Sequence, residues 1–152
     1  MPPRRFVFDT NIYRYSATSP EFETRIRKEF HSIRMSAVVL SELWRSAQTR
    51  SAQAYVHTIE QNLGRFIFAP TPRDWRMVGQ YLSTRLSRAG RKPTADALHA
   101  IRKEQNDALI ALSSWNQGFA VVTSDQDFER IRTWVEAPPW KLLRIPAPAP
   151  SP

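Results

Sequence analysis

Five acidic residues stand at positions from which they can gather into one site: Asp9, Glu42, Asp107, Asp125 and Asp127. Asp9 directly follows a short apolar stretch, and Asp125 and Asp127 come just after another. In open α/β sheets, ligands bind outside the carboxyl ends of the strands, so two neighbouring strands would bring these carboxylates together. A cluster of carboxylates suits hard cations such as Mg²⁺ and Mn²⁺, which prefer oxygen ligands.

Other residue types that bind metals or act as nucleophiles contribute little to this site. The chain has no cysteine, which excludes disulfides, thiolate nucleophiles and Cys-ligated zinc. The three histidines lie outside the acidic motifs: His31, His57 and His99. The expected ligands are therefore all oxygens.

Each acid alone also has an ordinary structural explanation. Asp9 and Asp125 can serve as helix N-caps, because an aspartate oxygen accepts hydrogen bonds from free backbone N–H groups. Glu42 can be a solvated helix residue, and Asp107 can pair with an arginine. The functional hypothesis therefore rests on the combination of the five acids.

The rest of the chain is strongly basic. It has 22 Lys and Arg against 14 Asp and Glu, a net charge of +8, and only nine acids outside the candidate site. Eighteen of the basic residues are arginines, which bind phosphate through a planar fork, although a high genomic GC content would also favour Arg. An acidic site within a basic protein suits a metal-dependent nuclease, since the metal must be held and the polyanion attracted.

Hydrophobic periodicity predicts the elements that position the acids. Short apolar runs predict strands at residues 5–8, 33–36, 66–68, 119–123 and 142–145. Amphipathic spacing predicts helices at residues 21–30, 38–48, 52–63, 74–88, 95–115 and 125–132. Gly64 and Gly118 are expected to end two of these helices, and polar residues 9–11 to form a turn and a helix N-cap. Strands separated by helices indicate an α/β domain with a mainly parallel sheet.

A chain of 152 residues fits one domain, which we predict at residues 1–145, followed by a Pro-rich disordered tail at residues 146–152. No apolar run reaches the roughly 18 to 20 residues of a membrane span. The apolar stretch near the N-terminus is too short for a signal peptide. We therefore expect a cytoplasmic protein that makes no use of a membrane.

Four sequence blocks occur in the order found in PIN domains: FDTNI at residues 8–12, SEL at 41–43, NDALIA at 106–111 and VTSDQDF at 122–128. The chain most resembles VapC-type toxins of type II toxin–antitoxin systems, over residues 5–145. The resemblance implies a three-layer α/β/α sandwich with a mainly parallel central sheet. It also implies an Mg²⁺- or Mn²⁺-dependent endoribonuclease that cuts structured RNA, such as tRNA or rRNA, and leaves a 5′-phosphate. Members are commonly homodimers and are neutralised by a cognate antitoxin.

The resemblance also implies roles for individual residues. The acids that match the family's catalytic quartet are Asp9, Glu42, Asp107 and Asp125. The implied supporting residues are Asn11, Thr123 and Asp127. The implied metal ligands are Asp9, Asp107, Asp125 and Asp127. Many relatives space the last block one residue longer, so the division of roles between Asp125 and Asp127 stays open.

A repeated motif provides two candidates for the third acid, because ADALHA at residues 95–100 echoes NDALIA at residues 106–111. Asp96 and Asp107 are eleven residues apart, about three turns, so both face the same side of one continuous helix. At 1.5 Å per residue they lie roughly 16 Å apart, so only one of them can share a metal with Asp9. We assign Asp107, whose helix feeds directly into the next strand. We place Asp96 at the helix start, where its charge suits the helix dipole.

The sequence is also compatible with two other functions. The first is a PIN-type nuclease outside a toxin–antitoxin pair, which acts in RNA maturation or on DNA. The second is a nucleic-acid-binding module with a degenerate site. The intact acidic set disfavours the second. Trp44 and Trp115 are expected to serve core or dimer packing rather than base stacking. Candidate RNA or antitoxin contacts are Arg45, Arg50, Arg85, Arg88, Arg91 and Lys92, although a solvated helix face is the better explanation for any single one.

Overall fold

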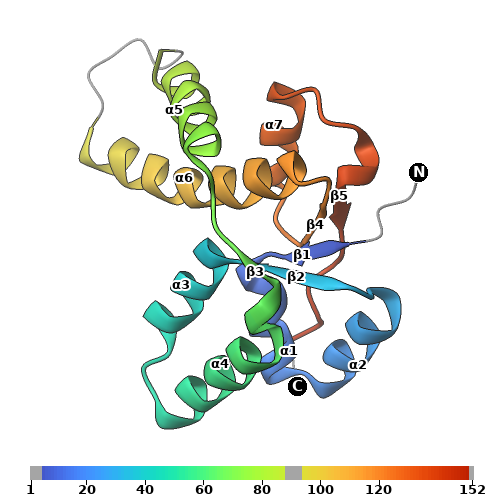
Figure 1. The fold of residues 1–152 in the computed structure, drawn as a ribbon. Coiled ribbons are helices and arrows are strands. Elements are labelled where there is room, and N and C mark those ends of the chain that lie inside the picture. The colour runs from blue at the N-terminus through green and yellow to red at the C-terminus, as the bar shows by residue number, and fades with distance from the viewer. Residues whose placement is uncertain (1–4, 88–93, 151–152) are drawn as a thin grey trace.

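The computed structural model describes residues 5–87 and 94–150 and forms a five-stranded sheet. The strands are β1 (Phe6–Phe8), β2 (Ile33–Ser36), β3 (Ile67–Phe68), β4 (Ala120–Thr123) and β5 (Leu142–Arg144), in the spatial order β3-β2-β1-β4-β5. All four pairings between these strands are parallel, which confirms the predicted sheet type. The order places β1 directly beside β4 (Figure 1).

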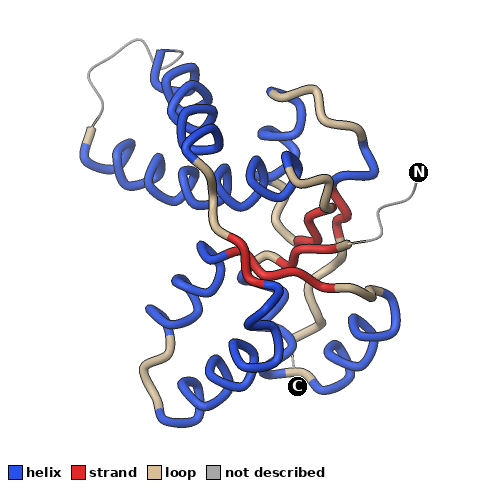
Figure 2. Tube along the Cα trace, in the orientation of Figure 1, coloured by secondary structure: helices blue, strands red, loops and turns tan. Residues whose placement is uncertain are grey.

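Helices cover both faces of the sheet and give the predicted three-layer α/β/α sandwich (Figure 2). One side carries α1 (Thr10–Thr18), α2 (Pro20–Glu29), α3 (Ala37–Ser46) and α4 (Arg50–Leu63). The other side carries α5 (Pro72–Ser87), α6 (Ala95–Asn116) and α7 (Asp127–Trp134). Short 3-10 turns, η1 (Gly64–Phe66) and η2 (Pro139–Lys141), lead into β3 and β5. Within the described residues, no helix is both long and apolar enough to cross a membrane.

The core covers both faces of the central strands, and on one face it includes the second half of α6. β4 is buried along its whole length, and Val7 of β1 has no exposed surface. In α6, residues 107–115 are buried, whereas the first turns of the helix are exposed. Continuous apolar strands are typical of parallel sheets, because both of their faces are covered. Asp107 therefore stands at the point where α6 enters the core.

One local prediction needs correction. Residues 10–18 form α1, which the sequence pattern predicts only as a turn and an N-cap; Asp9 is that cap, and Ile12 and Tyr13 are buried. Gly64 is the C-cap of α4, which ends at Leu63 as predicted; its φ of −46° and ψ of −49° are right-handed, and the chain continues into η1. Gly118, with φ +78°, ends α6 as predicted.

The two tryptophans that were expected to pack in the core or a dimer differ from each other. Trp115 is 4% exposed, and its Nε1 donates to the carbonyl of Lys141 at 2.8 Å, so core packing is confirmed. Trp44 is 38% exposed and donates to Glu60 at 3.2 Å, so core packing is wrong for this residue. The reason is that α3 buries a different face, which carries Val39 and Leu43.

Three of the predicted basic contact residues lie outside the described residues: Arg88, Arg91 and Lys92. Arg50 is exposed at the start of α4. In the predicted tail, residues 146–150 form neither helix nor strand.

Candidate active site

The five predicted acids come from both sides of the sheet to its carboxyl edge. Asp9 and Asp125 follow β1 and β4, which pair directly. Glu42 lies in α3, Asp107 in the middle of α6, and Asp127 at the first residue of α7. Asp107, Asp125 and Asp127 each offer a carboxylate oxygen, and these atoms all lie within 4.8 Å of one another. We call these three residues the acid triad.

Asp9 is held in place by hydrogen bonds from two threonines. Its side chain is buried, with Oδ1 accepting from the backbone N–H of Thr10 at 2.7 Å and Oδ2 from the hydroxyl of Thr123 at 2.9 Å. The oxygen of the same Thr123 hydroxyl accepts from the backbone N–H of Asp125 at 3.0 Å. Thr123 thus fixes Asp9 against Asp125, a geometry that fits the supporting role implied for it.

Glu42 is held by two residues that sequence reasoning missed. Its Oε2 accepts from the hydroxyl of Thr10, and its Oε1 accepts from the amide of Asn106 at 2.8 Å. Arg45 lies farther away, 3.9 Å from Oε1. In the sequence, the one indication of their involvement is that each is next to a candidate acid: Thr10 follows Asp9, and Asn106 precedes Asp107. Adjacency does not reveal which distant side chain such a residue will contact.

Asp107 is the acid whose charge is least compensated. It is 8% exposed, and its Oδ2 has no hydrogen-bond partner within residues 5–87 and 94–150. Burial raises the pKa of Asp107 from 3.8 to about 8, and the carboxylates of Asp9 and Asp125 add to the rise. Burial also raises the pKa of Asp9 to about 6, against the opposing effect of its hydrogen bonds. An ionised Asp107 therefore needs a nearby positive charge.

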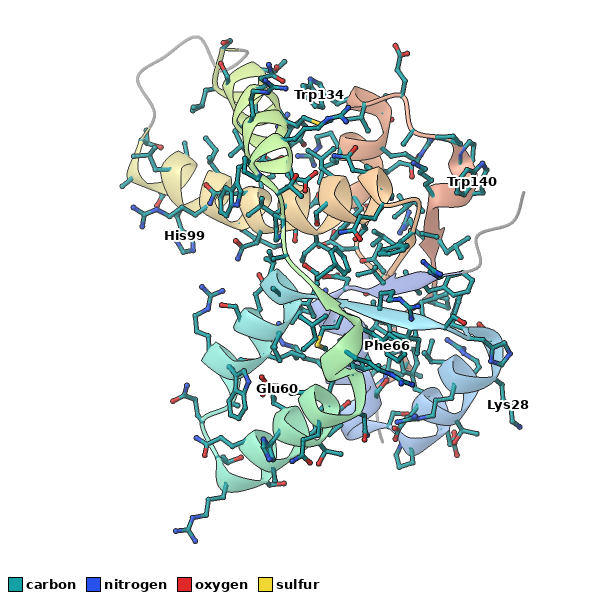
Figure 3. The ribbon with its side chains drawn as sticks, viewed as in Figure 1. Lys28, Glu60, Phe66, His99, Trp134 and Trp140 are labelled. Carbon is teal, nitrogen blue, oxygen red and sulfur yellow. The ribbon has the colours of Figure 1, made fainter. Side chains whose placement is uncertain are left out.

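These residues fit a hard divalent cation. The acid triad brings together oxygen donors alone, and the unpartnered Oδ2 of Asp107 is an available ligand atom. His99 is exposed and lies toward the start of α6, away from the sheet (Figure 3). Sites made of carboxylates suit Mg²⁺ or Mn²⁺, whereas zinc sites usually include His or Cys.

Two basic side chains also reach the acid triad, and neither is among the predicted contacts. Lys103 Nζ lies 3.8 Å from Oδ2 of Asp125, and a guanidinium nitrogen of Arg130 lies 2.9 Å from Oδ1 of Asp127. Their spacing along the helices could have indicated that they lie near the acids. Lys103 precedes Asp107 by four residues and Arg130 follows Asp127 by three, and both spacings place side chains on one helix face.

The remaining predicted positions are less involved. Asn11 is half-buried in α1, and its side chain makes no hydrogen bond within the part of the chain that the structure describes. Asp96 is exposed in the first turn of α6, as expected for a residue at the helix start, so Asp107 is the α6 aspartate that lies in the acid triad. Oδ1 of Asp125 accepts from the backbone N–H of Asp127 at 2.9 Å, and α7 begins there, two residues later than predicted.

The fold and the site together define a parallel α/β domain with an acidic cluster at the carboxyl edge of its sheet. A family model described as the PIN domain matches residues 6–133. The chain belongs to the PIN domain family. No curated protein sequence matches it.

Several solved structures share this fold. VapBC2 from Rickettsia felis, bound to a DNA fragment from its promoter, matches with a TM-score of 0.58 and 20% identity over 93% of this chain and 98% of that chain. VapBC-5 from Mycobacterium tuberculosis, a member of the VapBC family of toxin–antitoxin systems, matches with a TM-score of 0.56 and 18% identity over 94% and 100%. VapBC-1 from nontypeable Haemophilus influenzae matches with a TM-score of 0.57 and 19% identity over 93% and 97%.

Proposed function

We propose that this protein is an Mg²⁺- or Mn²⁺-dependent endoribonuclease and the toxin of a type II toxin–antitoxin pair. Membership of the PIN domain family supports a nuclease. The observation that carries the metal dependence is the buried carboxylate of Asp107, which has an unpartnered oxygen and two further carboxylates within reach. Burying such groups together is costly unless a cation joins them.

The acid triad would hold the cation, with Asp9 beside it as a further ligand. When bound, such an ion polarises the phosphate and lowers the pKa of a water molecule. Asp9 is oriented for its role as a ligand by the hydrogen bonds that its two carboxylate oxygens accept from Thr10 and Thr123. Glu42 is fixed by hydrogen bonds from across the fold and keeps this edge of the site rigid.

The charge of the chain supports a polyanionic substrate. Outside the five site acids, nine acidic residues face 22 basic ones, so phosphate groups are attracted to the molecule. We propose structured RNA, such as tRNA or rRNA, as the substrate. From the family we further propose a cytoplasmic homodimer whose nuclease domain is residues 1–145, with residues 146–152 as an appended tail.

A digest of total RNA with the purified protein and Mg²⁺, followed by mapping of the ends, tests this function. We expect cuts at defined sites that leave 5′-phosphates. Single- and double-stranded DNA in the same buffer should stay intact. Total RNA that remains uncut would refute the proposal, and cleavage of DNA at a similar rate would point to a general nuclease instead.

A groove on the α1, α3 and α4 side supports an antitoxin partner. It has a volume of about 500 Å³, and its apolar lining includes Leu43, Ala47, Ala52 and Val56. An amphipathic helix can place its apolar face in such a groove. We propose that the antitoxin binds here and inserts an Arg or Lys among the site acids in place of the metal.

Competition between this inserted cation and Mg²⁺ is the expected signature. Raising Mg²⁺ should weaken antitoxin binding several-fold more than monovalent salt at matched ionic strength, because screening alone affects both cases equally. Titration calorimetry with the wild type and Asp9→Asn measures the effect, and the variant should bind antitoxin more weakly. Equal affinity for both proteins, insensitive to Mg²⁺, would place the inhibitory contact away from the acids.

A further inference from the structure

The helices α5, α6 and α7 lie on one side of the sheet (Figure 1). A chain of ion pairs crosses these three helices and ends at Asp127. One guanidinium nitrogen of Arg130 lies 2.9 Å from Oδ1 of Asp127, and another lies 2.8 Å from Oε1 of Glu104. Glu104 also pairs with Arg85, whose Nε lies 3.1 Å from the same oxygen. The order of contacts is therefore Arg85, Glu104, Arg130 and Asp127.

We propose that Arg130 is a positioning residue that fixes Asp127 for metal binding; this inference rests on the proposed function and names a residue that supports its metal site. Asp127 has a side chain that is 33% exposed, so it can rotate into solvent unless it is held. The contact from Arg130 holds Oδ1, and the remaining oxygen makes no hydrogen bond within the described ranges. One oxygen is anchored and the other is available to a cation.

Arg130 can act in this way because it is itself anchored. Its side chain is 45% exposed, and a long exposed arginine loses conformational entropy when it is fixed. Glu104 is much less exposed, at 13%, and receives Arg130 from α7 and Arg85 from α5. Glu104 precedes Asp107 by three residues on α6, so the anchor and the central acid of the triad lie on one helix face.

The chain of ion pairs also balances charge. Its four members alternate in sign and sum to zero, so Asp127 joins the acid triad with a counter-charge already in place. In the metal-free site this lowers the repulsion that a third carboxylate adds beside Asp107 and Asp125. A nearby positive charge by itself weakens Mn²⁺ binding, so the gain in Mn²⁺ affinity that we assign to Arg130 comes from fixing Asp127 in place. Groups that hydrogen-bond to metal ligands typically change metal affinity by about 10- to 100-fold when they are removed.

The test is Mn²⁺ binding by titration calorimetry, a measurement that does not depend on RNA cleavage. Arg130→Ala should bind Mn²⁺ about tenfold more weakly than the wild type. Arg132→Ala is the matched control, because Arg132 makes an ion pair of the same spacing with Glu129 on the same helix and does not touch the acid triad. It should bind Mn²⁺ as the wild type does, and both variants should unfold cooperatively on heating.

A double-mutant cycle with Asp127→Asn distinguishes positioning from general destabilisation. If Arg130 acts through Asp127, then Arg130→Ala should change Mn²⁺ affinity less than about twofold once Asp127 has been replaced. A similar loss in both backgrounds, an equal loss in Arg132→Ala, or unchanged or higher affinity in Arg130→Ala would each overturn the inference. A wild-type protein that binds no Mn²⁺ would refute the proposed function as well, whereas intact RNA cleavage with an unaffected Arg130→Ala would refute the inference alone.

Discussion

Replacing Asp107 by Asn is expected to lower the rate of RNA cleavage by more than about 100-fold, because residues that merely support metal ligands already account for up to that much. The substitution keeps the size of the side chain but removes the charge of the central, unpartnered carboxylate of the acid triad. Initial rates of cleavage of one mapped RNA site, at saturating Mg²⁺, measure the loss.

The same substitution should stabilise the metal-free protein, with a defined pH dependence. Folded Asp107 keeps its proton up to a pH of about 8, since its pKa is raised from 3.8 to about 8 by burial. Between these values the folded state binds more protons than the unfolded state, so the free energy of unfolding of the wild type falls as pH rises. Asn does not ionise. The two proteins should be similarly stable below about pH 4, and Asp107→Asn should be more stable by on the order of 4 kcal/mol at about pH 7.

Asp96→Asn is the control for both measurements. Asp96 lies on the same helix but is exposed in its first turn, where its charge interacts with the helix dipole. Cleavage should stay within about twofold of the wild type, and stability should fall by about 0.5 kcal/mol. An inactive Asp96→Asn together with an active Asp107→Asn would show that the wrong aspartate of α6 was assigned to the site.

Removing divalent cations should abolish cleavage completely. The candidate ligands are carboxylate oxygens, and their mutual repulsion is relieved when a divalent ion joins them. Excess EDTA should therefore reduce cleavage to background, and Mg²⁺ or Mn²⁺ added beyond the chelator should restore it.

Two controls make this result specific. Monovalent salt at matched ionic strength should not restore cleavage, because screening alone does not supply a ligand for the carboxylates. Asp107→Asn should stay inactive when Mn²⁺ is returned. Cleavage that persists in excess chelator would mean that the protein hydrolyses RNA without the acid triad holding an ion.

Much of the framework follows from local sequence patterns. Apolar runs place the five strands, and the spacing of apolar residues in α6 predicts one continuous helix from residue 95 to 115, found as Ala95–Asn116. Helix geometry then separates Asp96 from Asp107 before any contact is known. The parallel arrangement follows because helices of sufficient length connect successive strands.

The contacts between elements within the site follow from the tertiary structure alone. Thr123 reaches Asp9 across 114 residues of sequence, and Asn106 reaches Glu42 across 64. No periodic pattern links such positions, since periodicity describes only neighbours on one helix or strand. The same holds for Trp44, whose apolar character predicts burial although α3 turns it outward.

The order of side chains along the chain thus determined which acids were available and on which elements they stand. Their ionisation was decided by the packing of α6 against β4, which removes Asp107 from water and raises its pKa to about 8. Helical spacing places Arg130 beside Asp127, but its contact with Glu104 was decided by the packing of α5, α6 and α7 on one side of the sheet. Desolvation and charge pairing act through space, and distance in space is set by the fold rather than by position in the sequence.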